Sequence, residues 1–309
     1  MLIAVIGATG NQGSSVLEAA LESEDAVAVR AVVRDARSDR ASALSGRVAE
    51  IVEADLDDPE ILRRAFAGAD AAYCVTPGDG DWGRETTRAR NMAHAAHGAK
   101  LQHVIWSTQE DTRQVLDAAG STIPVLRGCY RVPSYDAKAE ADAAFRELGV
   151  PTTFMRTSFY WESLFLPGIG PAPAPPGGAV IRWPLGDARL PGIAVADIGR
   201  CAVGAFMQRS TYAGRTIGIC GEELTGAEIA AAIQDALGVD CRYEPVERDE
   251  FPTAAGTANM FQYKRDFEQL HRRYRDVALS RSLNPRLRTF RQWLGEDATK
   301  ATFRRLLGS

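Results

Sequence analysis

Short apolar runs alternate with amphipathic segments through the first half of the chain, and this alternation limits the folds open to it. The apolar runs are rich in Val, Ile and Ala, which suits strands buried on both faces of a sheet. They lie at Leu2–Ile6, Val27–Val33, Val48–Val52, Ala69–Val75, His103–Ser107 and Val150–Met155. The amphipathic segments have helical spacing and lie at Gly13–Ser23, Pro59–Phe66, Glu85–His97, Thr112–Ala119 and Ala137–Leu148. Repeated alternation predicts an α/β fold with a doubly wound parallel sheet.

The pattern changes after Met155. Residues 167–178 are rich in proline and glycine and predict a flexible or polyproline-like loop. A strand-then-helix pattern returns at Ile193–Ala205, and another short strand follows at Thr216–Cys220. A chain of 309 residues suggests about two domains. We expect a sheet domain from residues 1–156 and 192–222, and a smaller, interleaved α/β lobe from residues 157–191 and 223–309.

Composition excludes several classes of protein. Hydrophobic residues make up 45% and charged residues 25%, which are average values for a soluble globular chain. No window approaches the roughly 18 apolar residues of a membrane span, and the chain opens on a strand-like run, so we expect a cytoplasmic protein. The five cysteines are scattered and show no C-x-x-C spacing, which favours free thiols. His94 and His97 lack further ligands nearby, so no metal site is expected. A net charge of −4 argues against nucleic acid as a partner.

A glycine-rich turn follows the first strand directly and opens a helix. Glycines in such a turn allow tight backbone approach, and the helix N-terminus offers N–H groups and partial positive charge to a pyrophosphate. The spacing is G-x-x-G-x-x-G, and its position after a strand and before a helix is what a dinucleotide-binding motif requires. The residues expected to contact the dinucleotide here are Gly7, Thr9, Gly10, Asn11, Gln12 and Gly13. The first domain is therefore predicted to be an NAD(P)-binding Rossmann domain.

The end of the second strand indicates which dinucleotide is preferred. Arg34 lies about twenty residues past the last glycine, where an arginine pairs with the 2′-phosphate of NADP and an acid would bind the ribose of NAD. Arg37 and Arg40 follow closely and add positive charge. Asp35, one residue further on, keeps NAD open as the less favoured alternative. The sequence predicts NADP.

Three further strand ends fall where a doubly wound sheet meets its cofactor. Candidate contacts to the adenine follow the third strand, and candidate contacts to the ribose and nicotinamide follow the fourth. Hydroxyl groups after the fifth strand face the nicotinamide or the substrate in this interpretation. Ordinary turn chemistry explains the same residues equally well. The residues concerned are Asp55, Leu56, Val75, Thr76, Pro77, Ser107 and Thr108.

Together these motifs resemble the NmrA-like branch of the short-chain dehydrogenase/reductase superfamily. The matching segments are GATGNQG at 7–13, VVRD at 32–35, EADLDD at 53–58, VIWS at 104–107, SYDAK at 134–138, LGVPTTFMR at 148–156, IAVADIGR at 193–200, TANMFQY at 257–263 and LNPRLRTFRQWL at 283–294. The resemblance covers nearly the whole chain. It implies NADP in the first lobe and a small C-terminal lobe over the nicotinamide.

The same resemblance implies one of two functions. Some members reduce or oxidise small organic molecules, and others are similar to redox-sensing regulators that bind the dinucleotide without chemistry. The first predicts a small-molecule substrate and an NADP(H)-dependent oxidoreductase. The second predicts a regulatory protein partner, and a homodimer is open in either case.

The catalytic pattern of the superfamily is incomplete in this chain. Short-chain dehydrogenases use Tyr-x-x-x-Lys on one helix, in which the tyrosine protonates the carbonyl oxygen. Lys138 matches the family lysine, but Ser134 stands at the tyrosine position and Tyr135 lies only three residues before the lysine. Three alternatives remain for the proton donor: Lys138 itself, Tyr135, or a hydroxyl or carboxyl group within residues 157–162.

A substrate pocket is expected at the start of the second lobe. Glu162 adds an ionisable group where similar proteins tend to have asparagine, and a solvated helix face is the simpler interpretation of it. Aromatic and sulfur-containing side chains there could form an apolar wall, or they could form the core of the lobe. The pocket candidates are Thr108, Phe159, Tyr160, Glu162 and Met260.

Overall fold

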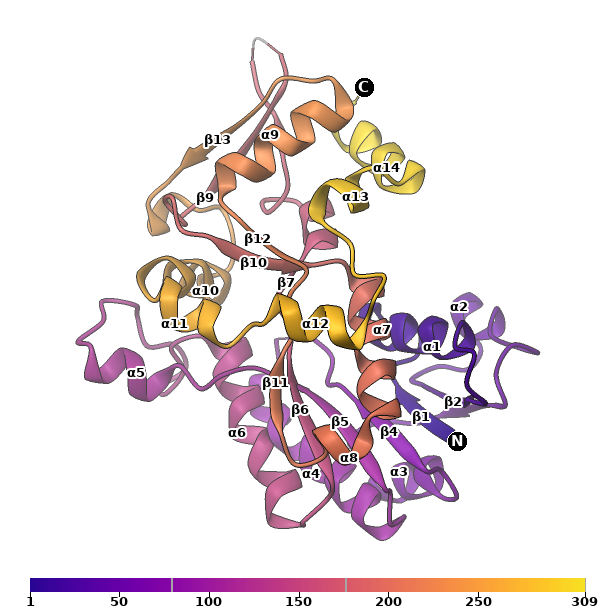
Figure 1. Ribbon diagram of the computed structural model, residues 1–309. Coiled ribbons are helices and arrows are strands. Elements are labelled where there is room, and N and C mark those ends of the chain that lie inside the picture. Colours follow the sequence, from indigo (N-terminus) through magenta and orange to yellow (C-terminus); the bar gives the residue numbers. More distant parts are fainter. Residues whose placement is uncertain (79, 176, 309) are drawn as a thin grey trace. The chain divides into compact units, whose positions relative to one another are not determined.

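The computed structural model describes residues 1–78, 80–175 and 177–308, which divide into two compact units (Figure 1). The first unit contains Met1–Asp111, Pro133–Thr157 and Val195–Gly218. The second contains Thr112–Val132, Ser158–Ala194 and the chain from Ile219 onward. The sequence places residues 112–132 in the first domain, whereas the structure groups this segment with the second unit.

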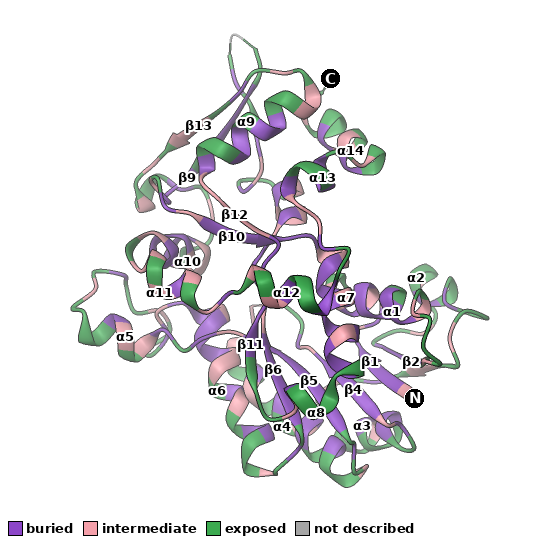
Figure 2. Ribbon diagram, viewed as in Figure 1, coloured by how far each residue is buried: buried purple, intermediate pink, exposed green. Residues whose placement is uncertain are grey.

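A seven-stranded parallel sheet forms the centre of the first unit and confirms the doubly wound α/β fold. The strand order is β11-β6-β5-β4-β1-β2-β3, so β1 pairs on one side with β2 and on the other with β4. The strands are β1 (Leu2–Ile6), β2 (Ala28–Val33), β3 (Glu50–Glu53), β4 (Ala71–Cys74), β5 (His103–Thr108), β6 (Thr152–Arg156) and β11 (Thr216–Gly218). All of β4 and β5 is buried, as expected for a sheet covered on both faces (Figure 2).

Helices of the first unit form two groups. Helix α1 packs on α7, while α4 packs on both α3 and α6. Successive side chains along β1 point to opposite faces of the sheet. Ala4 and Ile6 belong to the core under α3, α4 and α6, and the buried side chains of Ile3 and Val5 point to the opposite face. The helices are α1 (Asn11–Leu21), α2 (Asp39–Ser42), α3 (Pro59–Phe66), α4 (Trp82–Gly98), α6 (Pro133–Glu147), α7 (Val195–Met207) and α8 (Arg209–Tyr212).

Helix α6 begins at Pro133, four residues earlier than the expected start at Ala137. Proline is favoured in the first turn of a helix, because its missing N–H has no intrahelical partner there and its φ angle is already helical. Tyr135 and Lys138 therefore both lie on this helix.

The second unit contains two three-stranded sheets and the remaining helices. One sheet has the order β12-β10-β7 and the other β13-β9-β8. The strands are β7 (Phe159–Tyr160), β8 (Ala172–Pro173), β9 (Ala179–Trp183), β10 (Leu190–Ile193), β12 (Glu222–Leu224) and β13 (Cys241–Pro245). The helices are α5 (Arg113–Ala118), η1 (Trp161–Phe165), α9 (Gly226–Leu237), η2 (Arg248–Glu250), α10 (Ala255–Asp266), α11 (Glu268–Arg273), α12 (Val277–Leu283), α13 (Phe290–Leu294) and α14 (Asp297–Leu307).

The proline-rich segment supplies the edge strand β8, which pairs antiparallel with β9. Proline cannot donate to a sheet ladder, so Pro173 is tolerated at an edge. Pro176, within the same predicted loop, lies outside the described residues.

Aromatic side chains fill the core of the second unit. Trp161 contacts Phe290 and Trp293, and Phe159 contacts Trp183 and Phe261. These rings meet mostly edge to face or tilted, the geometry that aromatic quadrupoles favour.

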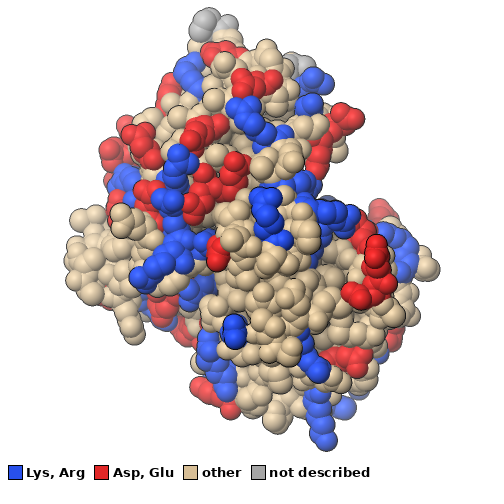
Figure 3. Space-filling model, in the orientation of Figure 1, with Lys and Arg blue, Asp and Glu red and all other residues tan. Residues whose placement is uncertain are grey.

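Basic side chains of the C-terminal region lie beside acidic ones. Arg272 pairs with Glu223 and Glu268, and Arg291 pairs with Asp235. Figure 3 shows blue and red side chains interspersed on the surface over β9, β12 and β13. Across the described ranges, no helix is both long and apolar enough to cross a membrane.

Candidate functional site

The glycine turn after β1 is closed tightly on itself. Gly7 has a φ of +64°, and its carbonyl oxygen accepts a hydrogen bond from the Gly10 N–H at 2.8 Å. A Cβ atom on Gly13 would stand 2.1 Å from that same oxygen, and one on Gly10 would stand 3.3 Å from it. Only glycine fits at Gly13, since real Cβ atoms do not approach a carbonyl oxygen so closely. The backbone here has the shape that a dinucleotide pyrophosphate requires.

Helix α1 offers its N-terminus at this turn. Gly10 is the N-cap, so no side chain satisfies the first N–H groups, and the first turn contains no acidic residue. An anion is favoured at such a terminus because the helix dipole and the backbone N–H groups both point at it. Thr9 and Gln12 are half-buried and Asn11 is exposed. The amide oxygen of Gln12 accepts a hydrogen bond from the Tyr73 hydroxyl on β4.

Three exposed arginines follow β2. None of Arg34, Arg37 and Arg40 forms a side-chain ion pair with another described residue. The Asp35 carboxylate accepts the backbone N–H of Arg37 at 2.8 Å and so serves the turn. The three guanidinium groups therefore form no salt bridge with a described residue, so pairing with a 2′-phosphate would break no ion pair.

The turn after β3 keeps Asp55 exposed, where its carboxylate accepts the Asp57 N–H at 3.0 Å. The neighbouring Leu56 is half-buried, and its carbonyl oxygen accepts a hydrogen bond from Asn91 at 2.9 Å. After β4, Val75 is half-buried, Thr76 is buried and Pro77 is exposed. The cofactor contacts assigned to these residues stay predictions.

Lys138 is tied to the end of β4 and to helix α4. Its ammonium donates to Thr76 Oγ1 at 2.6 Å and to Glu85 Oε1 at 2.9 Å. The Thr76 hydroxyl in turn donates to Glu85. The ammonium also lies 5.3 Å from the ring centroid of Trp106 on β5. Residues from three elements thus hold one cation at the carboxyl end of the sheet.

The two residues near the missing tyrosine position differ in exposure. Ser134 is half-buried and stands one helical turn before Lys138, on the same face of α6. Tyr135 is only 5% exposed. Its role as proton donor stays a prediction.

Two residues with hydroxyl groups, Ser107 and Thr108, end strand β5. Ser107 is buried. Thr108 donates to Asp142 Oδ1 on α6 at 2.6 Å, and the Trp106 indole N–H donates to the same oxygen at 2.9 Å. Burial raises the pKa of Asp142 to about 6, although these two hydrogen bonds oppose the shift. Thr108 thereby joins β5 to the helix that carries Lys138.

Asp142 makes stability depend on pH, and Asp142→Asn tests this. Between the ordinary Asp pKa of 3.8 and about 6 the folded chain binds the proton more tightly than the unfolded chain, so stability falls as pH rises. Because Asn keeps an accepting oxygen and carries no charge, we expect Asp142→Asn to raise the free energy of unfolding by about 2 kcal/mol above pH ~6. The gain should vanish below the ordinary Asp value. Denaturant unfolding across this range measures it, with Asp39→Asn on the exposed α2 as control. Parallel curves for Asp142→Asn and the native chain would contradict the expectation.

The expected pocket residues of the second lobe lie in or beside its aromatic core. Phe159 is buried against Trp183 and Phe261, and Met260 packs on the same core. Glu162 Oε1 accepts a hydrogen bond from the Trp293 indole at 3.2 Å, and Tyr160 is half-buried. This packing supports the core interpretation of Phe159, while contact with a substrate stays a prediction for all four.

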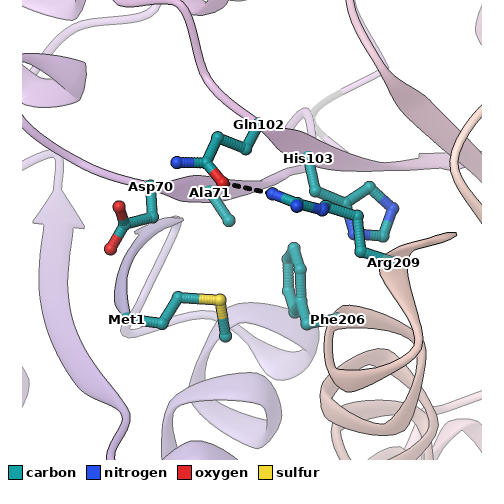
Figure 4. Close-up of a pocket in the computed structure, with 7 residues that line it drawn as sticks. All are labelled: Met1, Asp70, Ala71, Gln102, His103, Phe206 and Arg209. Carbon is teal, nitrogen blue, oxygen red and sulfur yellow. Dashed lines mark hydrogen bonds between the residues drawn. The ribbon is translucent and has the colours of Figure 1, made fainter.

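A cavity of about 270 Å³ lies at the amino ends of the strands, opposite the end that carries the glycine turn (Figure 4). It is lined at the amino ends of the strands by Met1, Asp70, Ala71, Gln102, His103, Phe206 and Arg209. Doubly wound sheets bind their cofactors at the carboxyl ends, so this cavity is separate from the dinucleotide turn. Burial and the nearby Arg209 lower the pKa of His103 to about 4. His103 therefore stays neutral at neutral pH.

A profile of the NmrA-like family matches residues 1–293. The chain belongs to the NmrA-like family. This confirms the resemblance found in the motifs.

Two curated relatives of this NmrA-like chain are oxidoreductases by name. It is 27% identical over 266 residues to the NmrA-like family domain-containing oxidoreductase FrzB of Cladobotryum sp, covering 79% of this chain and 76% of the relative. It is 28% identical over 250 residues to the NAD(P)H azoreductase of Xenophilus azovorans, covering 81% and 78%.

Solved structures share the fold. The crystal structure of NmrA, a negative transcriptional regulator, superposes with a TM-score of 0.79 at 22% identity, covering 96% of this chain and 95% of that one. NmrA has been solved in complex with NAD and in complex with NADP. At this identity the likeness establishes the fold alone.

The NmrA-like chain has two site features that the sequence did not predict. Glu85 is the one acidic residue of helix α4, and no spacing rule relates it to Lys138. Asp142 follows Lys138 by four residues. This spacing, which puts both residues on the same face of α6, is the one signal in the sequence that points to Asp142. No cluster of three or more metal-ligating side chains occurs in the parts of the chain that the structure describes.

Proposed function

We propose that this chain is an NADP(H)-dependent oxidoreductase acting on a small organic substrate. The observation that carries the proposal is the glycine turn after β1, which a Cβ atom on Gly13 would fill, together with the N-terminus of α1, which has no capping side chain. Lys138, like the glycine turn, lies at the carboxyl ends of the strands. Oxidoreductases among the curated relatives favour an enzyme over a binding module.

Preference for NADP over NAD rests on the loop after β2. Arg34, Arg37 and Arg40 are exposed and carry no side-chain ion pair among the described residues, so a 2′-phosphate gains their charge without breaking a contact. The Asp35 carboxylate already accepts a hydrogen bond from the Arg37 N–H of its own turn, which argues against a contact between Asp35 and the ribose of NAD.

Replacing Arg34 with alanine tests the cofactor preference. We expect the affinity for NADPH to fall about 10- to 100-fold and that for NADH to change less than about twofold, because the lost contact is to the 2′-phosphate. Isothermal titration calorimetry with both cofactors measures this. Arg63→Ala serves as control, since Arg63 is an exposed arginine paired with Glu60 on α3. Equal losses of affinity for NADPH and NADH would show that Arg34 does not contact the 2′-phosphate.

Lys138 has two roles in the proposed reaction. Its ammonium binds the cofactor ribose, and an N–H proton passes from Nζ to the substrate oxygen as that oxygen becomes a hydroxyl; the amine then regains a proton from water. The bound nicotinamide supplies hydride chemistry at C4. The alternative proton donors remain Tyr135 and a hydroxyl or carboxyl group within residues 157–162.

Substrates of the proposed enzyme contain an electrophilic double bond: a carbonyl, an imine or a conjugated alkene. A screen of quinones, azo dyes and conjugated ketones, followed by NADPH consumption, is the direct test. Sustained NADPH consumption with at least one acceptor supports the proposal.

A non-catalytic redox sensor is the second candidate, because Ser134 replaces the tyrosine proton donor. A sensor would bind NADP and NADPH with different affinities, or change its oligomeric state or its protein partner between them. Calorimetry with both forms, with gel filtration of each complex, separates the candidates. Similar affinities for NADP and NADPH, with no change in oligomeric state between the two complexes, would contradict the sensor and favour the enzyme.

A further inference from the structure

A buried carboxylate faces Lys138 that neither the family pattern nor the expected chemistry requires. The Glu85 side chain is 2% exposed and that of Lys138 is 15% exposed. Burying a carboxylate is unfavourable unless it is paired and hydrogen-bonded. Glu85 satisfies both conditions through Lys138 and the Thr76 hydroxyl.

Hydrogen-bond donors at this cluster can be counted. A lysine ammonium has three N–H donors and no acceptor. Two of them are used, one on Thr76 Oγ1 at 2.6 Å and one on Glu85 Oε1 at 2.9 Å. The single hydroxyl hydrogen of Thr76 goes to Glu85, so Thr76 must accept from Lys138. The three groups form a closed ring in which Lys138 donates twice, Thr76 accepts once and donates once, and Glu85 accepts twice, and one N–H of Lys138 is left over.

The ring fixes where that remaining N–H lies. Thr76 follows β4 directly and Glu85 lies in the first turn of α4. Lys138 itself stands on α6, which packs along α4. A flexible four-carbon side chain is thereby held at both its base and its tip. Side-chain entropy that a free lysine would lose on binding a ligand has already been lost.

We propose that Glu85 is a positioning residue for Lys138. Together with Thr76 it holds the ammonium so that the third N–H is presented to the cofactor ribose and the substrate oxygen. The fixed, charged lysine compensates for the tyrosine that the chain lacks at position 134. This role rests on the proposed function, because it assumes that Lys138 contacts cofactor and substrate.

A double-mutant cycle tests whether Glu85 acts through Lys138. The four proteins are the native chain, Glu85→Gln, Lys138→Met and the double variant, each assayed for kcat, for KM and for NADPH affinity. We expect Glu85→Gln to lower kcat about tenfold in the native background and to change it less than about twofold when Lys138 is already methionine. Replacing a residue that only stabilised the fold would lower the free energy of unfolding without lowering kcat of the folded protein. Additive effects, or an unchanged kcat in Glu85→Gln, would overturn the proposal.

Two further variants keep the test decisive. Glu60→Gln, an exposed glutamate on α3, is the matched control and should leave kcat unchanged. If Glu85→Gln does not fold, Thr76→Val opens the ring without leaving a buried carboxylate uncompensated. We expect it to lower kcat in the native background and to have no further effect with Lys138→Met.

Failure of the proposed function gives a different result. If the native chain binds NADPH but turns over no acceptor, the oxidoreductase proposal fails. The double-mutant cycle is then evaluated from NADPH affinity instead of kcat. Weaker NADPH binding in Glu85→Gln, confined to the Lys138 background, then supports the positioning role. Equal affinities of Glu85→Gln and the native chain contradict it.

Discussion

Replacing Gly13 with alanine is expected to abolish NADP(H) binding and to lower the free energy of unfolding by about 3 kcal/mol or more. The new methyl group would stand 2.1 Å from the Gly7 carbonyl oxygen and 2.8 Å from that of Ile6. Both are backbone atoms, so the helix must move away from the turn to make room. The N-terminus of α1 then no longer lies over the bend that accepts a pyrophosphate.

Other glycines give graded controls. A Cβ on Gly10 would be 3.3 Å from the Gly7 oxygen, so Gly10→Ala should lose affinity only partly. Gly98, at the end of α4, has no neighbour within 4 Å of such an atom, and Gly98→Ala should bind NADPH as the native chain does. Calorimetry measures affinity, and denaturant unfolding measures stability. Tight NADPH binding by a folded Gly13→Ala protein would show that this turn is not the cofactor site.

Replacing Lys138 with methionine is expected to lower kcat at least about 100-fold, or about 2.7 kcal/mol in the activation free energy. Methionine keeps most of the side-chain length but removes the charge, the ribose contact and the transferable proton. NADPH affinity should fall much less, about tenfold or below, because the pyrophosphate and the 2′-phosphate are bound elsewhere in the first unit.

Lys100→Met is the matched control, since Lys100 is exposed and follows α4 near the amino end of β5. It should retain full kcat. A Lys138→Met protein that turns over as fast as the native chain would transfer the proton-donor role to Tyr135 or Glu162, and Tyr135→Phe and Glu162→Gln would then show which.

The sheet was predictable because its signal is local. Most strands of the first unit contain a short run of apolar residues, and each glycine of the turn is visible in the sequence. The predicted start of α6 at Ala137 is wrong, because the helix begins at Pro133 and so includes Tyr135.

Contacts between distant segments were not predictable. Glu85 and Lys138 are 53 residues apart, and only the packing of α4 on α6 brings their side chains together. The assignment of Thr108 to the substrate pocket stays a prediction, and the hydrogen bond from its hydroxyl to Asp142 is a contact that a hydroxyl at a strand end does not reveal in the sequence. The apolar side chains at the start of the second lobe were equally ambiguous, because rings that pack in a core and rings that line a pocket are the same residue types.

Transfer of label from nicotinamide C4 is the most direct test of hydride chemistry in this chain. NADPH carrying deuterium at C4 would be incubated with the protein and with each ketone and conjugated ketone in turn, because deuterium transferred to carbon does not exchange with water, and the products analysed by mass spectrometry. We expect deuterium in the reduced product of at least one acceptor, at a rate that falls sharply in Lys138→Met. Tight NADPH binding with no label transferred to any ketone and no NADPH consumed with any quinone or azo dye would contradict the oxidoreductase and leave a dinucleotide sensor.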